Sequence, residues 1–388
     1  MRLISRTLDQ IDSPIGATYA LLAHRTGDRP LLDLAQAAPA YPAAPEVVDH
    51  IASVAKEPHA GSYVVIAGLD PLRAAFADEL SGAYAGEVRA DNVLITAGCN
   101  QAFCLATSTL AAPGDEVILP LPYYFNHDMW LRLEGITPVY IEPGPEWMPD
   151  PAAARRAITP RTRAIVLVTP GNPTGVTVSP AAIAEFAAVA AESGIALVID
   201  ETYRGFRGSQ APAHALFAHP AWGETIVSLH SFSKDFAIPG YRVGALVAAP
   251  KLIRESMKLL DCVAICAPRI GQEAALAGLR HAASWRRARA LEVSEKLAAF
   301  RAVMANRPGG FELAACGAFF GWIRHPFEGR PTEDVVRDLL LDHDVLVIPG
   351  TAFLPDDRRM IRASIANLEA PAIEEFAHRL MLAGKRLP

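Results

Sequence analysis

Residues 231–244 read Ser-Phe-Ser-Lys-Asp-Phe-Ala-Ile-Pro-Gly-Tyr-Arg-Val-Gly. The apolar run from Thr225 to Leu229 that precedes them predicts a buried strand, which leads into a hydroxyl-rich turn. Lys234 lies among apolar neighbours just beyond this strand. Because such a lysine loses solvation, its pKa falls and more of it is the nucleophilic amine. The alternative is a structural lysine at a strand end.

The same stretch carries groups that suit a phosphate. Ser231 and Ser233 supply two hydroxyl donors, and Arg242 supplies a planar cation. A nucleophilic lysine forms Schiff bases with carbonyl compounds, and one of these is pyridoxal 5'-phosphate (PLP). The stretch therefore indicates a PLP site as well as a reactive lysine.

Composition limits the class of protein. The chain has 388 residues, of which 51% are hydrophobic and 20% charged, so it is globular and long enough for two or three domains. Its net charge of −6 gives no support for nucleic-acid binding. No apolar run reaches the roughly 18 residues of a membrane span, and the first residues do not resemble a signal peptide. Five cysteines without a Cys-x-x-Cys pair predict a reduced, cytoplasmic protein with no disulfide frame and no metal site.

Strands and helices alternate through the middle of the chain. Apolar runs predict strands at 92–96, 116–120, 136–141, 164–169, 195–199, 225–229 and 243–248. Helical patterns lie between several of them, and such alternation is typical of a mainly parallel sheet wrapped by helices. A helical region from 270 to 306 should contain a domain change. Short strands follow at 311–313, 317–323 and 345–348, with an edge-like strand at 360–365.

Polar residues follow several of these strands. Asp200 ends the strand at 195–199, and ligands of open α/β sheets bind beyond the carboxyl ends of strands. Asn172 lies between prolines and glycines that fix its backbone and aim its amide. The turn at Gly98 opens a helix, whose free N–H groups suit a phosphate. The alternatives are a paired structural aspartate, a rigid turn and a plain strand-to-helix turn.

Other candidates are aromatic or basic. Tyr124 follows a strand and can stack on a flat ring, or it can be a packed loop residue. Tyr63 lies in a loop and can simply pack on a neighbouring residue. Arg362 in an apolar strand requires an anionic partner, either a ligand or a structural salt bridge. His127 is not included, because a lone histidine here is more often structural.

These motifs carry a resemblance to a known family. Ser-x-Ser-Lys followed by Gly-x-Arg-x-Gly resembles the lysine motif of the class I/II aminotransferases, the fold-type I PLP enzymes. The resemblance extends from Tyr63 to Arg362. It implies an α/β fold with a mixed, mainly parallel seven-stranded sheet wrapped by helices in a large domain, and a smaller α+β domain. It divides the chain into an N-terminal arm (1–48), the large PLP-binding domain (49–283) and the small C-terminal domain (284–388).

The resemblance also implies residue roles. Lys234 is similar to the lysine that carries PLP as a Schiff base and shuttles the substrate proton. Asp200 resembles the partner of the pyridine nitrogen, and Tyr203 and Asn172 resemble the donors to the phenolic oxygen. Residues that resemble the phosphate cup are Gly98, Cys99, Asn100, Ser231, Ser233 and Arg242.

The remaining implied roles concern stacking, substrate and assembly. Tyr124 stands where the family has its ring-stacking aromatic residue. Tyr63 resembles the tyrosine that reaches the phosphate of the neighbouring subunit, which implies a homodimer. Arg362 resembles the arginine that binds the substrate α-carboxylate, with Asn172 and Ala37 beside the substrate. Ala37 is a departure, because the family usually has glycine there. No second arginine or lysine can be assigned to a distal substrate carboxylate.

The sequence leads to three functional hypotheses, which differ in the reaction catalysed or in the class of protein. The first is a PLP-dependent aminotransferase that moves the amino group of an L-amino acid to a 2-oxo acid by a ping-pong Schiff-base mechanism. The second keeps the fold and cofactor but is a lyase, synthase or oxidase acting on an amino acid. The third is a sensor or partner-binding module, which the retention of all the motif residues disfavours.

Overall fold

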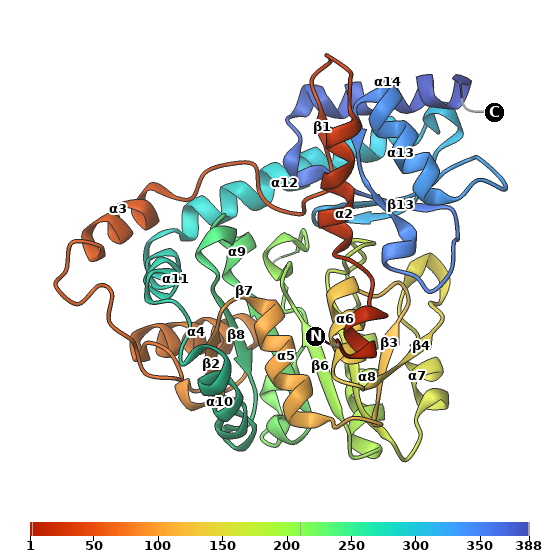
Figure 1. The fold of residues 1–388 in the computed structure, drawn as a ribbon. Coiled ribbons are helices and arrows are strands. Elements are labelled where there is room, and N and C mark those ends of the chain that lie inside the picture. The colour runs from red at the N-terminus through yellow and green to blue at the C-terminus, as the bar shows by residue number, and fades with distance from the viewer. Residues whose placement is uncertain (2, 210, 387–388) are drawn as a thin grey trace.

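A seven-stranded mixed sheet forms the centre of the protein (Figure 1). The computed structural model describes residues 1, 3–209 and 211–386. The strands follow the order β2-β8-β7-β6-β5-β3-β4, and β8 alone runs against the other six. Their bounds are β2 (Val93–Thr96), β3 (Glu116–Pro120), β4 (Thr137–Ile141), β5 (Thr162–Val168), β6 (Ala196–Asp200), β7 (Ile226–Ser231) and β8 (Gly244–Val247). The predicted α/β fold with a mainly parallel sheet is confirmed.

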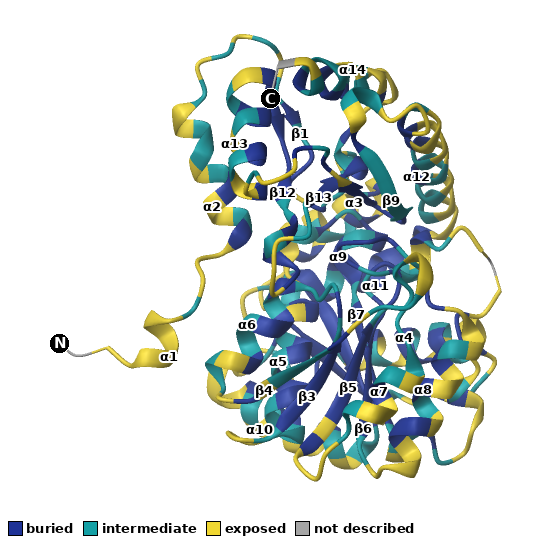
Figure 2. Ribbon diagram, turned by 90° about the vertical axis from the view of Figure 1, so that its right-hand side faces the viewer, coloured by how far each residue is buried: buried dark blue, intermediate teal, exposed yellow. Residues whose placement is uncertain are grey.

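Both faces of this sheet are buried, as the uniform hydrophobicity of its strands predicts. Alternate residues of a strand point to opposite faces, so Ile165 packs with the helices of one face and Val166 with those of the other. The first face is covered by α4 (Asp70–Tyr84), α7 (Pro151–Ala157), α8 (Pro180–Glu192) and α11 (Arg269–His281). The second face is covered by α5 (Cys99–Leu110), α6 (Phe125–Leu133) and α10 (Pro250–Ala264). Figure 2 shows the buried strands between these layers.

Local signals set the ends of these helices. The Ser179 hydroxyl accepts a hydrogen bond from the N–H of Ala182, and Pro180 occupies the first turn of α8, where its missing donor costs nothing. Gly194 follows α8 with a φ of 64°, a left-handed conformation that glycine adopts without strain. Gly194 therefore lets the chain turn away from the end of α8.

A smaller unit contains a four-stranded antiparallel sheet, ordered β12-β13-β10-β9. Its strands are β9 (Glu312–Gly317), β10 (Phe320–Arg324), β12 (Ile348–Pro349) and β13 (Met360–Ser364). The helices α12 (Ala283–Met304), α13 (Thr332–His343) and α14 (Ala370–Arg386) pack around a second apolar core.

The N-terminal residues approach both parts of the molecule. The short helices α1 (Ser5–Leu8) and α2 (Pro14–Ala20) precede β1 (Leu32–Asp33), which pairs in parallel with β11 (Val345–Leu346). Helix α3 (Pro45–Val54) packs against α11. Figure 2 shows α1 projecting from the body. The division of the chain at residues 48 and 283 stays a prediction.

Three sequence-based expectations in the C-terminal region are wrong. Residues 317–323 form a hairpin between β9 and β10, because Gly317 ends its strand against the backbone of Gly175 and Ala318 turns the chain with a φ of 45°. Strand β13 is interior rather than at an edge, since β12 covers its other side. Residues 345–348 divide between β11 and β12. Within the described residues no helix has both the length and the apolar character needed to cross a membrane.

Candidate active site

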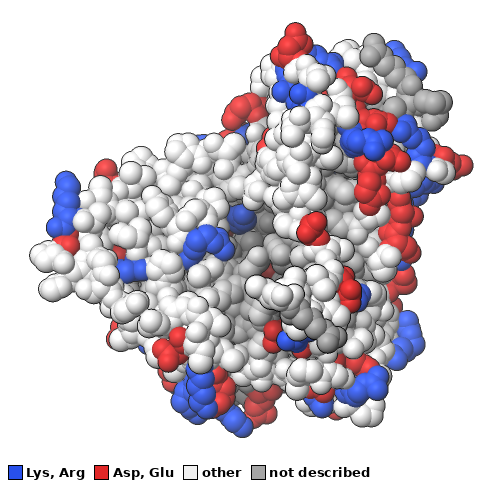
Figure 3. All heavy atoms as spheres, in the orientation of Figure 1, with Lys and Arg blue, Asp and Glu red and all other residues white. Residues whose placement is uncertain are grey.

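A cavity of about 380 Å³ lies beyond the carboxyl ends of β5, β6 and β7, where the large sheet faces the smaller unit. The face drawn in Figure 3 is hollowed near its centre. Most of the site residues that were predicted from the sequence line this cavity. They are Ala37, Cys99, Asn100, Tyr124, Asn172, Asp200, Tyr203, Ser231, Ser233, Lys234, Arg242 and Arg362.

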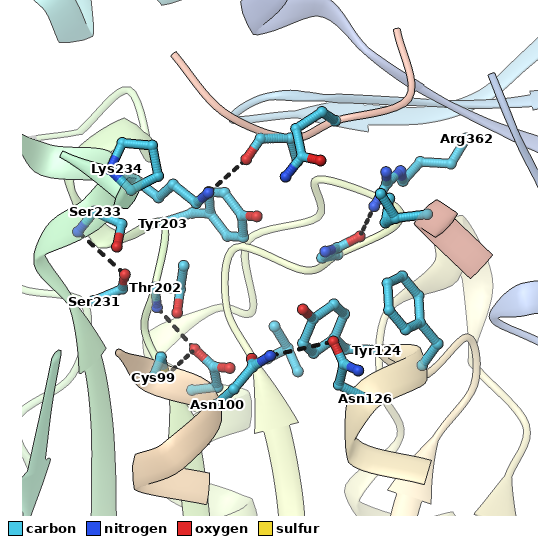
Figure 4. A pocket seen from close by; sticks show the side chains of 18 of the residues that line it. Cys99, Asn100, Tyr124, Asn126, Thr202, Tyr203, Ser231, Ser233, Lys234 and Arg362 are labelled. Carbon is cyan, nitrogen blue, oxygen red and sulfur yellow. Dashed lines mark hydrogen bonds between the residues drawn. The ribbon is translucent and has the colours of Figure 1, made fainter. Parts of the chain in front are cut away.

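Lys234 projects into the cavity from α9 (Phe232–Asp235), the single helical turn after β7 (Figure 4). Its Nζ donates a hydrogen bond of 2.6 Å to the carbonyl oxygen of Ala37. Burial, together with the positive charges of Arg242 and Arg362, lowers the pKa of Lys234 to about 8. A large fraction of this amine is therefore uncharged at mildly alkaline pH.

The Asp200 carboxylate lies at the floor of the cavity and is held from three sides. It accepts a hydrogen bond of 2.9 Å from the Thr202 N–H, and the thiol of Cys99 lies 3.5 Å from Oδ1. Nε2 of His127 lies 3.4 Å from Oδ2. Burial alone would raise the pKa of Asp200, but the hydrogen bond and charge of His127 and the hydrogen bonds of Thr202 outweigh it and hold that pKa below its ordinary value.

His127 is a contact that sequence reasoning left out. Its ring stacks on Phe103, with the ring centroids 3.9 Å apart, and meets Tyr124 edge-on at 5.1 Å. The missed signal is helical spacing, since Tyr124 and His127 lie three residues apart where α6 begins. No helix was predicted at residues 125–133, so the shared face of the two residues was not recognised.

The end of the cavity near α5 is built to accept an anion. Gly98 precedes α5 with a φ of 87°, and any side chain there would clash with the Arg242 guanidinium. Arg242 donates hydrogen bonds to the carbonyl oxygens of Pro239 and Ala97 at 3.0 and 3.2 Å. Ser231 Oγ accepts a hydrogen bond from the N–H of Ser233, whereas Ser233 Oγ is buried and has no partner among the described residues. A free hydroxyl, a cation and a helix N-terminus therefore converge.

Arg362 projects from β13 on the side of the cavity opposite Lys234 (Figure 4). It is 1% exposed and donates to Asn172 Oδ1 at 3.0 Å and to the carbonyl of Ala35. Its guanidinium also lies over the rings of Phe320 and Phe353. Burial lowers the pKa of Arg362 to about 10. Within the described residues no carboxylate forms an ion pair with it, and its Nε has no partner. The structure therefore favours a ligand anion over a structural salt bridge.

Two tyrosines complete the walls of the cavity. Tyr124 precedes α6, and burial raises the pKa of its hydroxyl to about 12. Tyr203 is 5% exposed, packs edge-on against Phe319 and Phe320, and also has a raised pKa because it is buried. Both hydroxyls therefore remain protonated donors near neutral pH.

The predicted site residues and the residues that line the cavity differ in two respects. Tyr63 does not line the cavity, and it is 76% exposed. Conversely, Ser13, Ile15 and Gln36 from the N-terminal segment line the cavity without having been predicted. No motif marks them, because only the packing of the N-terminal segment brings them to the site.

Comparison with known proteins supports one family. The family model for aminotransferase class I and II matches residues 29–380. The chain belongs to the class I and II aminotransferases.

Individual relatives agree with this assignment. An aspartate aminotransferase of Pyrococcus horikoshii is 31% identical, with 80% of each chain covered. An aromatic aminotransferase of Arabidopsis thaliana is 28% identical over 97% of this chain and 95% of the relative. The solved structure of an aspartate aminotransferase from Thermus thermophilus with maleate superposes with a TM-score of 0.87 at 25% identity, covering 99% of this chain and all of that one. The protein is therefore an aminotransferase that depends on PLP.

Proposed function

We propose that this aminotransferase moves the amino group of an L-amino acid to a 2-oxo acid at the cavity between Lys234 and Arg362. One observation carries the proposal. A buried amine with a pKa of about 8 and a buried guanidinium without a carboxylate partner face one cavity from opposite sides. An α-amino acid presents the matching groups, because its reacting carbon is bonded directly to its carboxylate.

The residues near α5 fit the phosphate of PLP. Ser233 Oγ lacks a partner, and the absence of a side chain at Gly98 leaves room beside the Arg242 guanidinium. The first N–H groups of α5, at Cys99 and Asn100, have no partner within the helix and are attracted to an anion. Ser231 stands beside them at the end of β7. These residues would hold the phosphate.

The floor and walls fit the pyridine ring. Asp200 keeps its negative charge because of His127 and Thr202, so it would keep a ring nitrogen protonated. Tyr124 would stack on the ring, while Tyr203 and Asn172 would donate to the phenolic oxygen. PLP, when bound, supplies an aldehyde for the amine and a ring that withdraws electrons.

The chain's own groups then orient the substrate and move its proton. The Arg362 guanidinium would bind the α-carboxylate, and its contact with Asn172 Oδ1 fixes the direction of the planar fork. Lys234 would hold the cofactor and, when released, its uncharged Nζ would accept the proton from the substrate α-carbon. Ala37 borders the same space and keeps Lys234 directed across the cavity through its carbonyl.

A homodimer with a shared site is part of the proposal. Tyr63, Val65, Val263 and Ile265 are exposed apolar residues. Their segments are adjacent, since Arg269 Nη1 donates to the carbonyl of His59 at 2.7 Å. We call these four residues the dimer patch. A second copy covering it would bury its apolar side chains and bring Tyr63 towards the phosphate end of the partner's cavity.

We also propose a cytoplasmic location, which the five free cysteines support.

The test follows the bound cofactor of the purified holoenzyme. Its visible absorption should be lost when an L-amino acid is added alone, and it should return with a 2-oxo acid. The Lys234→Ala variant should fold and bind the cofactor without either change, and Lys234→Arg controls for the lost charge. Release of ammonia without a need for a 2-oxo acid would favour the lyase or oxidase alternative. Full turnover by Lys234→Ala would overturn the role of Lys234.

A further inference from the structure

Each cation that lines the cavity already has a role in the proposed function. Among the described lining residues these cations are Lys234, Arg242 and Arg362. Arg242 is held at the phosphate end by the carbonyl oxygens of Ala97 and Pro239. Lys234 lies on one side of the cavity and Arg362 on the opposite side (Figure 4). None of the three remains for a second carboxylate of the substrate.

The lining that comes from the N-terminal segment and from α6 is uncharged. Its side chains include Ser13, Ile15, Gln36, Phe125 and Asn126, and Asn126 is joined to Asn100 at the start of α5. The Nδ2 of Asn100 donates a hydrogen bond of 3.2 Å to Oδ1 of Asn126, so the two side-chain amides bind each other (Figure 4). An amide pair offers hydrogen bonds, but it offers no charge to neutralise an acid.

The apolar part of this lining is built into the fold. Ser13 caps α2, where its hydroxyl accepts from the N–H of Gly16, and Pro14 is buried. Ile15 packs into an apolar cluster that contains Tyr124 and Phe125. Since α2 also contacts β12, the position of Ile15 depends on the smaller unit as well as on the N-terminal segment.

From this lining we propose that the amino donor has an uncharged, largely apolar side chain, which Ile15 and Phe125 contact. The proposal rests on the proposed function, because it takes Arg362 as the site of the α-carboxylate. A side-chain carboxylate from aspartate or glutamate would lose water at this wall without gaining a cation, and a buried charge without a partner is strongly disfavoured. Aliphatic, thioether and aromatic side chains would gain apolar contacts instead.

The first experiment measures the half-reaction of the holoenzyme with single L-amino acids through the absorption of the bound cofactor. Leucine, methionine and phenylalanine are compared with aspartate and glutamate. At least one of the neutral donors should exceed both acids in kcat/KM by about 100-fold or more. An acid that reacts best would overturn the proposal and would indicate a cation from the partner subunit. If no amino acid changed the absorption, the proposed function itself would fail, which is a different result.

A positive charge introduced by substitution tests the same part of the cavity lining. Asn126→Lys should raise kcat/KM for aspartate about tenfold relative to Asn126→Met, a control of similar shape without charge. Ile15→Ala is a second, independent variant. It should lower kcat/KM for leucine and phenylalanine by about fivefold or more while leaving alanine as donor almost unchanged. Equal responses to alanine and leucine would show that Ile15 does not contact the side chain.

Discussion

The ionisation of Lys234 is decided by its surroundings rather than by its place in the motif. Burial is the main reason for its low pKa, and the charges of Arg242 and Arg362 add to it. All three effects disfavour the ammonium form. Arg362 therefore influences the amine across the cavity, in addition to its own contact with Asn172.

This arrangement predicts the pH dependence of the amine in the apoprotein. Lys234 is charged and unreactive below a pH of about 8 and becomes uncharged above it. The rate of its acylation by an amine-specific reagent, followed by peptide mass spectrometry, should rise through that pH and then level off. Arg362→Met should move the midpoint to higher pH, because one of the charges that lower the pKa is removed. A wild-type midpoint near the ordinary lysine value would contradict the assignment.

At the same scale, sequence reasoning identified Asp200, Lys234 and the two arginines that act on Lys234, but not the histidine that lowers the pKa of Asp200. A carboxylate after a buried strand and a lysine in a motif are visible in one dimension. The contact between Asp200 and His127 joins β6 to α6, and the two residues are 73 positions apart in the chain. Such a contact depends on the order of strands in the sheet, and no local pattern encodes it.

At the scale of the element, the end of β6 sends two acids in opposite directions. Asp200 faces the cavity, whereas Glu201 is buried on the other side. Glu201 accepts hydrogen bonds from the Tyr84 hydroxyl at 2.5 Å and the Ser228 hydroxyl at 2.9 Å, and His214 lies 3.6 Å away. Burial alone would raise the pKa of Glu201, but the nearby imidazole of His214 and the hydrogen bond from Tyr84 outweigh it and hold that pKa far below the ordinary value.

Glu201→Gln should therefore destabilise the protein by about 2–4 kcal/mol near neutral pH, because the buried amide can accept from only one of the Tyr84 and Ser228 hydroxyls and turns an N–H donor towards the other. The contribution of a carboxylate with a depressed pKa is present above its unfolded pKa and is lost as the pH falls towards its folded pKa. The difference between wild type and variant in urea unfolding should consequently shrink in acid. Glu185→Gln on the exposed side of α8 is the control and should change stability by less than about 0.5 kcal/mol. A difference that stayed constant from neutral pH to strong acid would contradict this account.

Most elements of the large sheet follow from the sequence, whereas the smaller unit does not. Buried parallel strands are continuous apolar runs, and β3 was located to the residue at 116–120. The hairpin of β9 and β10 was missed because Gly317 marks a close approach to Gly175, which is a long-range contact. The strand at 360–365 was predicted to be edge-like, yet β13 is interior because the two-residue strand β12 covers it.

At the scale of the whole molecule, the proposed homodimer can be tested by mixing two defective variants. If Tyr63 serves the partner's site, a hybrid of a Lys234→Ala subunit and a Tyr63→Ala subunit contains one site with both residues intact. Equal mixing with subunit exchange should then restore about a quarter of wild-type activity, since half of the dimers are hybrids with one good site each. Each variant alone should stay weakly active or inactive. No recovery in a mixture shown to exchange subunits would place Tyr63 at its own subunit's site or at none.

The pairing of β1 with β11 also bears on the order in which the protein is made. A growing polypeptide releases residues 32–33 early, but their partners at 345–346 appear only when nearly nine-tenths of the chain has left the ribosome. Until then Leu32 and Leu34 have no apolar core to enter, because that core is formed largely by residues after 300. Prematurely terminated products would keep this N-terminal strand exposed, which gives proteolytic quality control a means of distinguishing them from the finished enzyme.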